Sequence, residues 1–288
     1  MTQSLTEDFR GYARRALASK ARVARHTESE KSPVLEDTIC TVTAEENLGW
    51  AGAYYWAAPV FYGEGPVTME THADFPAVRQ FYVTGKENWR LKSFSEPLSC
   101  FYTSWYGLFE ASAHLTDVTG EVPFPVQDWV LLAPLAGDHG ITGELTWAQF
   151  PQETPPESMT QGDRAELFAA YVRAINAADV DAIMAVHSDN AVAASRTYGG
   201  FDETFVGLQS PAEIRDFWTK LFATFEIQVV ETVNLLNRNW YLFAELSWEA
   251  TRRATGERVH FLTAEQLHIG AAGTFWARLG FGTPAESE

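Results

Sequence analysis

Hydrophobic residues in the second half of the chain recur with a helical period as far as residue 225. Asp163 followed by Glu166 indicates a capping box that opens a first helix. The apolar positions of this helix follow at helical spacing and are Leu167, Phe168, Tyr171, Val172 and Ile175. Asp179 is suited to cap a second, short helix that runs through Val186.

A third helix is predicted after Ser210-Pro211, because proline is favoured in a first helical turn. Its apolar stripe comprises Ile214, Phe217, Trp218, Leu221, Phe222 and Phe225. Three consecutive helices in this region indicate a helical layer that needs a partner surface to bury its apolar side.

The period changes to two over Trp240–Ala250, which indicates a half-buried strand. The predicted inner face of this strand comprises Trp240, Leu242, Ala244, Leu246, Trp248 and Ala250. Two more strands are predicted over 257–269 and 274–281, separated by turns at 254–256 and 270–273. Helices followed by strands predict an α+β domain with a curved antiparallel sheet.

Residues 151–162 are polar, contain three prolines and show no apolar period, so they are interpreted as a linker. This divides the chain into a domain of residues 1–150 and a domain of residues 163–288. Matching pairs recur about 136 residues apart in the two halves, among them Tyr62-Gly63 with Tyr198-Gly199 and Trp105-Tyr106 with Trp240-Tyr241. We therefore predict an internal repeat, in which the first copy is divergent.

Composition narrows the possible partners. The chain has 288 residues, of which 14% are aromatic, and its net charge is −17. This charge argues against binding to nucleic acid or to an anionic membrane surface, although six basic residues between Arg10 and Arg25 form an exception. That basic segment docks on a partner or a membrane surface, forms a solvated helix face, or packs against the acidic remainder of the chain.

The sequence offers little support for metals, nucleotide cofactors or export. It contains two cysteines, no phosphate-binding glycine motif, no apolar signal core and no apolar run of membrane-spanning length. We expect a cytoplasmic protein that uses neither a metal nor a cofactor.

Three segments carry a family resemblance: residues 165–192, 207–222 and 255–267. They resemble the SnoaL-like branch of the nuclear-transport-factor-two-like superfamily, which includes ketosteroid isomerase and limonene epoxide hydrolase. The resemblance implies two tandem cone-shaped α+β domains, each enclosing an apolar cavity in which an Asp, His or Tyr acts without a cofactor. It also implies that the outer sheet faces pair, so that the two domains form an internal pseudo-dimer, with homo-oligomers possible.

The family's usual catalytic carboxylate maps onto Ser195, and its repeat counterpart is Pro59, so neither copy carries a carboxylate there. Glu265 is the next candidate, because the alternation of its strand places it on an apolar face. The alternative is a structural ion pair with Arg278 on the neighbouring strand. The counterpart of Glu265 at a spacing of 136 is Trp129, which argues against one mechanism in both copies.

Two other polar residues are candidates for the catalytic site. His187 follows the second helix and is suited to accept a proton at neutral pH, or else it simply terminates that helix. Tyr198, with Tyr62 as its counterpart, is suited to donate to a carbonyl or oxyanion. His260 and His268 alternate in face with Glu265, so a shared metal is not expected.

Six aromatic residues are the candidates for binding an apolar substrate: Tyr62, Trp218, Phe222, Trp240, Trp248 and Phe261. The leading hypothesis is a cofactor-independent cyclase, isomerase, dehydratase or other lyase that acts on an aromatic, polyketide or terpenoid-like metabolite. The alternatives are a non-catalytic ligand carrier or assembly protein, and an epoxide hydrolase of the tandem polyether type. We also predict that sheet faces with Tyr106 and Phe109, or with Tyr241 and Phe243, meet another sheet.

Overall fold

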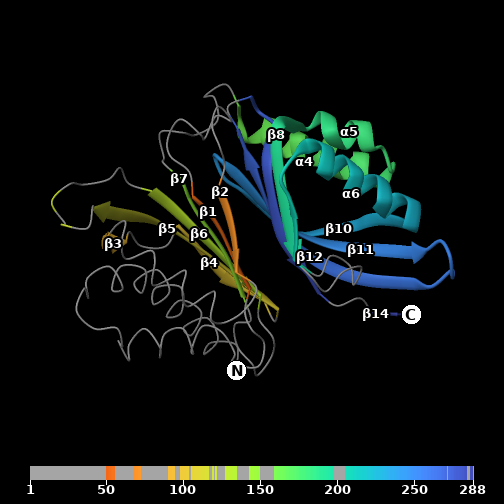
Figure 1. The fold of residues 1–288 in the computed structure, drawn as a ribbon, viewed down its shortest axis with the longest axis horizontal. Coiled ribbons are helices and arrows are strands. Elements are labelled where there is room, and N and C mark those ends of the chain that lie inside the picture. The colour runs from red at the N-terminus through yellow and green to blue at the C-terminus, as the bar shows by residue number, and fades with distance from the viewer. Residues whose placement is uncertain are drawn as a thin grey trace. The chain divides into compact units, whose positions relative to one another are not determined.

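The computed structural model describes residues 50–55, 68–72, 90–94, 98–103, 105–116, 119, 121, 127–134, 143–149, 159–196, 205–270, 272–283 and 286–287. The chain divides into two compact units (Figure 1). Unit 1 comprises residues 1–58 and 67–152, and unit 2 comprises residues 59–66 and 153–288. Each unit is described by itself.

Unit 1 is built around a seven-stranded sheet in the order β2-β1-β7-β6-β5-β3, with β4 paired to β5. Its strands are β1 (Trp50–Tyr55), β2 (Thr68–His72), β3 (Arg90–Phe94), β4 (Ser99–Tyr102), β5 (Tyr106–Thr116), β6 (Gln127–Pro134) and β7 (Gly143–Gln149). The β1–β7 pair is parallel and the others are antiparallel.

Unit 2 contains three described helices, α4 (Gln161–Asn176), α5 (Val180–Ala185) and α6 (Pro211–Thr224), on one face of a curved sheet (Figure 1). The seven-stranded sheet has the order β10-β11-β12-β13-β8-β9, with β14 paired to β12. Its strands are β8 (His187–Arg196), β9 (Phe205–Leu208), β10 (Phe225–Asn237), β11 (Tyr241–Arg252), β12 (Arg258–Ile269), β13 (Phe275–Gly282) and β14 (Glu286–Ser287). The prediction of an α+β arrangement is confirmed for this unit.

The prediction of a wholly antiparallel sheet is wrong, because β13 and β8 run parallel. Alternation along a strand reveals which side chains share a face but not which strand lies beside it. The residues that pair in β8 and β13 are far apart in sequence, and Arg278 lies opposite Ala193. The intervening helices and strands let the chain return in the same direction, as parallel pairs require.

The helix boundaries follow from their caps. Asp179 caps α5 and Ser210 caps α6 with Pro211 in the first turn, which confirms both predictions. The predicted start of the first helix is wrong: Thr160 is the N-cap, and Asp163 is its capping-box partner three residues later. Because Thr160 and Asp163 satisfy each other's backbone N–H groups, α4 begins earlier than the apolar period suggests.

Strand β10 is not revealed by the sequence pattern. Its first residues alternate between buried and exposed, but from Val230 onward the apolar residues Val230, Val233 and Leu235 are exposed. Register shifts between Val229 and Glu231 and between Thr232 and Asn234 break the period of two. Strands β11, β12 and β13 match the predicted segments closely, and Gly256 and Gly273 adopt positive φ angles in the predicted turns.

The core of unit 2 lies between the three helices and the inner face of the sheet. Trp218 and Phe222 of α6 stack on each other, and Trp248 of β11 stacks on Phe261 of β12. Large rings bury much apolar area at a low cost in side-chain entropy. Glu265 and Arg278 are charged residues buried in this apolar core.

The two sheets share one strand order and one pattern of directions when β1 to β7 are compared with β8 to β13. Tyr106 of β5 pairs with Pro134, as Tyr241 of β11 pairs with His268. If Tyr106 is the counterpart of Tyr241, the residue that corresponds to Glu265 is Leu131, which lies opposite Phe109 as Glu265 lies opposite Ala244. The assignment of Trp129 to this position is then wrong by two residues, because a loop shortens the spacing between copies.

Candidate functional site

Glu265 lies in the middle of β12 on the inner face of the sheet and is 1% exposed. Its strand neighbours on this face include Phe261, Leu267 and Ile269, which belong to the apolar core, so the predicted face is confirmed. Gly280 lies directly opposite on β13. A buried carboxylate is costly unless charges or hydrogen bonds compensate, so its surroundings decide what it can do.

A hydrogen-bonded chain reaches Glu265 from the sheet. The indole Nε1–H of Trp248 donates to Thr263 Oγ1 at 2.8 Å, and the Thr263 hydroxyl donates to Glu265 Oε1 at 2.8 Å. Thr263 lies two residues before Glu265, so both side chains point to the same face. These hydrogen bonds hold Oε1 of Glu265. The other oxygen, Oε2, is contacted by a different residue.

That residue is Arg278 on β13, which is 2% exposed. Its Nη1 lies 3.6 Å from Glu265 Oε2, so the ion pair expected under the structural alternative is present. Arg278 lies opposite Leu267 and is therefore the diagonal neighbour of Glu265. Its guanidinium also lies over the ring of Trp218, 5.3 Å from the ring centroid. Arg278 thus places a positive charge beside the buried carboxyl group in an otherwise apolar core.

Tyr171 connects this ion pair to the helices. Arg278 Nη1 donates to the Tyr171 hydroxyl oxygen at 3.5 Å, and the Tyr171 ring is fully buried between α4, α6 and β13. Burial raises the pKa of the Tyr171 phenol well above its ordinary value. Tyr171 therefore remains a neutral hydroxyl at physiological pH and is able to donate a hydrogen bond.

His187, the first residue of β8, packs edge to face against Tyr171 with ring centroids 5.9 Å apart. Its Nδ1 lies 2.8 Å from the Ile183 carbonyl oxygen at the end of α5. Because a carbonyl only accepts, Nδ1 carries the proton and Nε2 holds the lone pair. Burial lowers the pKa of His187 to about 4, so the imidazole is neutral at pH 7.

His187 also borders an open hollow of about 510 Å³ on the outside of the domain. The hollow is lined by α5, the start of β8 and the first turns of α6, including Met184, Ser188 and Pro211. At its rim, Arg215 of α6 forms an ion pair with Asp181 of α5. His187 thus lines the surface hollow and also contacts the buried polar cluster of Glu265, Arg278 and Tyr171.

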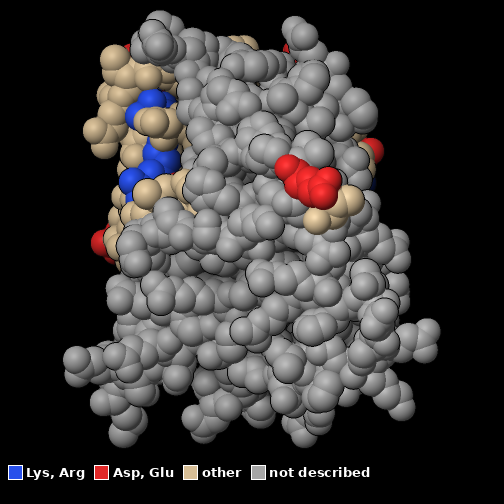
Figure 2. All heavy atoms as spheres, turned by 90° about the vertical axis from the view of Figure 1, so that its left-hand side faces the viewer, with Lys and Arg blue, Asp and Glu red and all other residues tan. Residues whose placement is uncertain are grey.

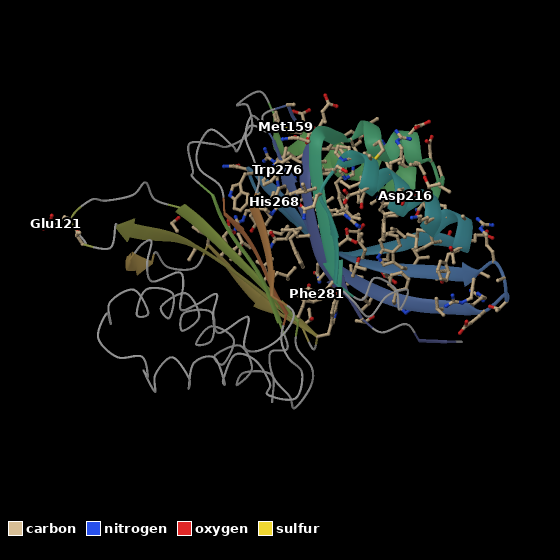
Figure 3. The ribbon with its side chains drawn as sticks, viewed as in Figure 1. Glu121, Met159, Asp216, His268, Trp276 and Phe281 are labelled. Atoms are coloured by element: carbon tan, nitrogen blue, oxygen red, sulfur yellow. The ribbon has the colours of Figure 1, made fainter. Side chains whose placement is uncertain are left out.

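The outer face of the sheet carries a different set of rings. His268 contacts Trp240 and Trp276 with ring centroids 5.2 and 5.3 Å apart, and Figure 3 places His268 and Trp276 on the side away from the helices. Burial lowers the pKa of His268 well below its ordinary value. His260 bonds Ser247 on the same face. Glu265 thus alternates in face with these histidines, as predicted, and within the described ranges no group of acidic, His or Cys side chains is suited to hold a metal.

The predicted aromatic residues divide between the two faces. Trp218, Phe222, Trp248 and Phe261 all lie in the inner core. The prediction that Trp240 shares the inner face of β11 is wrong, because its ring packs against Tyr241 and His268. Trp240 precedes the first residue of β11, so the alternation that holds from Leu242 onward does not apply to it.

Tyr198 and Tyr62 lie outside the described residues, so their predicted roles stay predictions. Ser195 is part of β8, opposite Gly280 of β13 and Val206 of β9. The sequence places Thr263 on the same strand face as Glu265, but its hydrogen bond to the carboxyl group was not predicted. Tyr171 was predicted only as an apolar position of its helix, because nothing in the helical pattern distinguishes it from the other apolar positions.

The face drawn in Figure 2 shows both basic and acidic side chains among its described residues. None of the helices in the described ranges is long and apolar enough to cross a membrane.

Part of unit 2 is similar to a known family of domains. Residues 168–277 match the family model of the SnoaL-like domain. The matched range includes Tyr171, His187 and Glu265 and ends one residue before Arg278. The match covers less than half of the chain and lies entirely in unit 2. No match is found among curated proteins.

Solved structures similar to the chain include three small proteins. A presumed polyketide cyclase from Xanthomonas campestris pv. campestris is 15% identical, with 42% of this chain and 90% of that chain covered and a TM-score of 0.36. A nuclear-transport-factor-two-like protein from Burkholderia xenovorans LB400 is 9% identical, with 44% and 93% covered and a TM-score of 0.37. The epoxide hydrolase/cyclase-like enzyme SalBIII, described in pyran ring formation in polyether salinomycin, is 20% identical, with 43% and 95% covered and a TM-score of 0.36.

Proposed function

We propose that the SnoaL-like domain of residues 168–277 is a cofactor-independent enzyme that uses general acid–base catalysis on an apolar small molecule. The observation that carries this proposal is Glu265, a carboxylate held in an aromatic core by Thr263 and Arg278. A carboxyl group held in this geometry is placed to take a proton from a substrate that displaces water. Aromatic, polyketide or terpenoid-like ketones suit the surrounding rings.

The proposed reaction begins with removal of a proton from a carbon next to a carbonyl group. The C–H electron pair moves into an enolate, and the proton moves to Glu265. Arg278 and the neutral Tyr171 hydroxyl, which already contact each other, are placed to stabilise the negative oxygen. Return of the proton at another atom gives isomerisation, while attack of the enolate on a second carbonyl gives cyclisation, and neither requires a further reactant.

The route to this cluster is the surface hollow beside His187. His187 lines the hollow and packs against Tyr171, so a ligand that reaches His187 is one ring away from Arg278. The hollow volume of about 510 Å³ falls in the range of small-molecule sites. An apolar ring entering here meets Met184, Ala185 and Ala212 before the polar cluster.

The test measures deuterium uptake from D₂O into a panel of apolar aryl ketones and β-diketones, followed by proton NMR with the purified full chain. Glu265→Gln is expected to slow enzyme-dependent exchange about 100-fold or more while the circular dichroism spectrum is retained. Glu257→Gln, in an exposed turn beside Arg252, is the matched control and should exchange at the wild-type rate. Unchanged exchange in Glu265→Gln would contradict the assignment of the base.

A non-catalytic ligand-binding or assembly protein is the alternative, favoured by the same ion pair in a purely structural role. Under this alternative, members of the ketone panel bind without exchange, and Glu265→Gln changes stability but no reaction rate. Hydrolysis of apolar epoxides by the same samples tests the remaining alternative, an epoxide hydrolase of the tandem polyether type, which needs a second acid besides the carboxylate.

We further propose that unit 1 is a divergent copy of the same domain without a catalytic carboxylate. The shared strand order and the presence of Leu131 at the register position of Glu265 support this. Pairing of the two copies as an internal pseudo-dimer, homo-oligomerisation and a cytoplasmic location stay predictions. The prediction that the sheet faces with Tyr106 and Phe109, or with Tyr241 and Phe243, meet another sheet also stays a prediction.

A further inference from the structure

Among the described residues of unit 2, the buried side-chain atoms without a hydrogen-bond partner include one atom on each of two rings of the inner core. These two atoms are the imidazole Nε2 of His187 and the indole Nε1 of Trp218. His187 is 6% exposed and Trp218 is fully buried. Leaving a buried donor or acceptor without a partner destabilises a fold, so each such atom requires an explanation.

The two atoms offer complementary hydrogen bonding. Because Nδ1 of His187 is used by the Ile183 carbonyl, Nε2 is the unprotonated nitrogen and is able only to accept. An indole Nε1–H is able only to donate. These two rings therefore carry one acceptor and one donor that make no hydrogen bond to a described residue.

Both rings pack against the same residue. Tyr171 contacts His187 at 5.9 Å and Trp218 at 6.3 Å between ring centroids, in both cases edge to face. Trp218 is also the ring under the Arg278 guanidinium, whereas His187 lines the surface hollow. The acceptor thus lies on the side of the entrance, and the donor lies on the side of the ion pair.

The same cluster contains polar groups that do have partners, and these mark the contrast. Trp248 directs its indole N–H to Thr263, and Arg278 contacts Glu265 and Tyr171. The indole N–H of Trp248 thus has a threonine hydroxyl as its acceptor, whereas the indole N–H of Trp218 has none in the described part of the chain. Trp218 Nε1 and His187 Nε2 instead lie buried without a hydrogen-bond partner among the described residues.

We infer that the substrate is an apolar hydroxy ketone whose hydroxyl donates to His187 Nε2 and whose carbonyl oxygen accepts from Trp218 Nε1–H. This inference rests on the proposed function, because the carbonyl is then placed beside Arg278 and Tyr171. A carbonyl held by Trp218 is the group whose neighbouring carbon Glu265 would deprotonate. The hydroxyl at His187 fixes which end of the molecule faces the entrance.

The test uses three probe ligands with one aromatic ring and a short chain. The benzaldehyde–acetone aldol carries both groups, benzylacetone lacks the hydroxyl, and 1-phenylbutan-1-ol lacks the carbonyl. Their dissociation constants are measured by NMR titration with the wild-type full chain and with Trp218→Phe and His187→Phe, which keep an aromatic ring. Each single hydrogen bond is expected to change affinity about 5- to 10-fold.

Trp218→Phe should weaken binding of the two ketones and leave the alcohol unchanged. His187→Phe should weaken binding of the two hydroxyl compounds and leave benzylacetone unchanged. His260→Gln, on the outer face, is the matched control and should bind all three as the wild type does. The inference is overturned if each variant weakens all three probes equally, or if the wild type binds none of them and the two atoms serve only water.

A second measurement on the wild type protects the test against variants that do not fold. In ¹⁵N-labelled protein, the ketones should shift the Trp218 indole N–H resonance and the hydroxyl compounds should shift the His187 Nε2 resonance. The absence of these selective shifts on saturation would also overturn the inference. If binding shows the predicted selectivity but no ketone exchanges deuterium, the inference stands and the proposed reaction fails. Glu265-dependent exchange without this selectivity gives the reverse result.

Discussion

Gly280 lies directly opposite Glu265 across the β12–β13 pair. A side chain at position 280 would occupy space next to the Glu265 side chain. A Cβ at this position would lie 2.6 Å from the Ala264 carbonyl oxygen and 3.1 Å from Cγ of Glu265. The first contact is with backbone, which is unable to move aside without a shift of the strand pair. The position of the candidate base therefore depends on a residue without a side chain.

Gly280→Ala is predicted to destabilise the protein by about 1–3 kcal/mol, because added atoms in a close-packed core force the backbone to shift. Urea unfolding followed by circular dichroism measures this change. Gly162→Ala in the first turn of α4 is the control, since its Cβ would meet only Thr160 Oγ1 at 3.5 Å, an ordinary contact. Equal stabilities of the two variants would show that the strand pair tolerates the added methyl group.

Arg278→Met should destabilise the protein by about 3–5 kcal/mol, because it leaves the Glu265 carboxylate buried without its positive partner. The double variant Glu265→Gln with Arg278→Met removes both charges and should recover most of this loss. Urea unfolding of the two single variants and the double variant gives the coupling free energy. Additive losses would mean that the two side chains do not stabilise each other.

Thr263→Val keeps the shape of the side chain but removes the hydroxyl that joins Trp248 to Glu265. The expected loss is about 1–3 kcal/mol, because an indole N–H and a carboxylate oxygen each lose a buried partner. Thermal unfolding measures the loss, and Thr219→Val on the exposed surface of α6 is the control. If Thr263→Val is as stable as the control, the hydrogen bonds from Trp248 to Thr263 and from Thr263 to Glu265 do not stabilise the fold.

Stability should fall between about pH 6.5 and pH 4, because His187 is buried as a neutral ring. Its folded-state pKa of about 4 lies below the ordinary unfolded value near 6.5, so the unfolded state binds the proton first as the pH falls. The contribution of His187 is complete above pH 6.5 and amounts to about 3 kcal/mol lost by pH 4.

His268, whose pKa is also lowered by burial, adds to the same slope. His187→Phe should therefore reduce the pH dependence of unfolding in urea without abolishing it. A variant with the full wild-type slope would show that His187 titrates normally in the folded state.

Much of the second domain was predictable, for reasons visible in particular residues. Ser210, Pro211 and Asp179 act through local backbone chemistry, so their helices could be placed from sequence. Glu265 and Arg278 could be paired because an acidic and a basic residue occupied apolar faces of neighbouring strands. The parallel pairing of β8 with β13 and the contact of Tyr171 with Arg278 could not be predicted, because contacts between distant segments leave no periodic pattern in the sequence.

The central claim is that Glu265 is a base and not only a partner of Arg278. The most direct measurement is deuterium exchange into the ketone panel by the Glu265→Gln/Arg278→Met double variant, in which removal of both charges is expected to preserve the fold. The account predicts a folded protein whose exchange rate is at least about 100-fold below that of the wild type. A folded double variant that exchanges at the wild-type rate would contradict it.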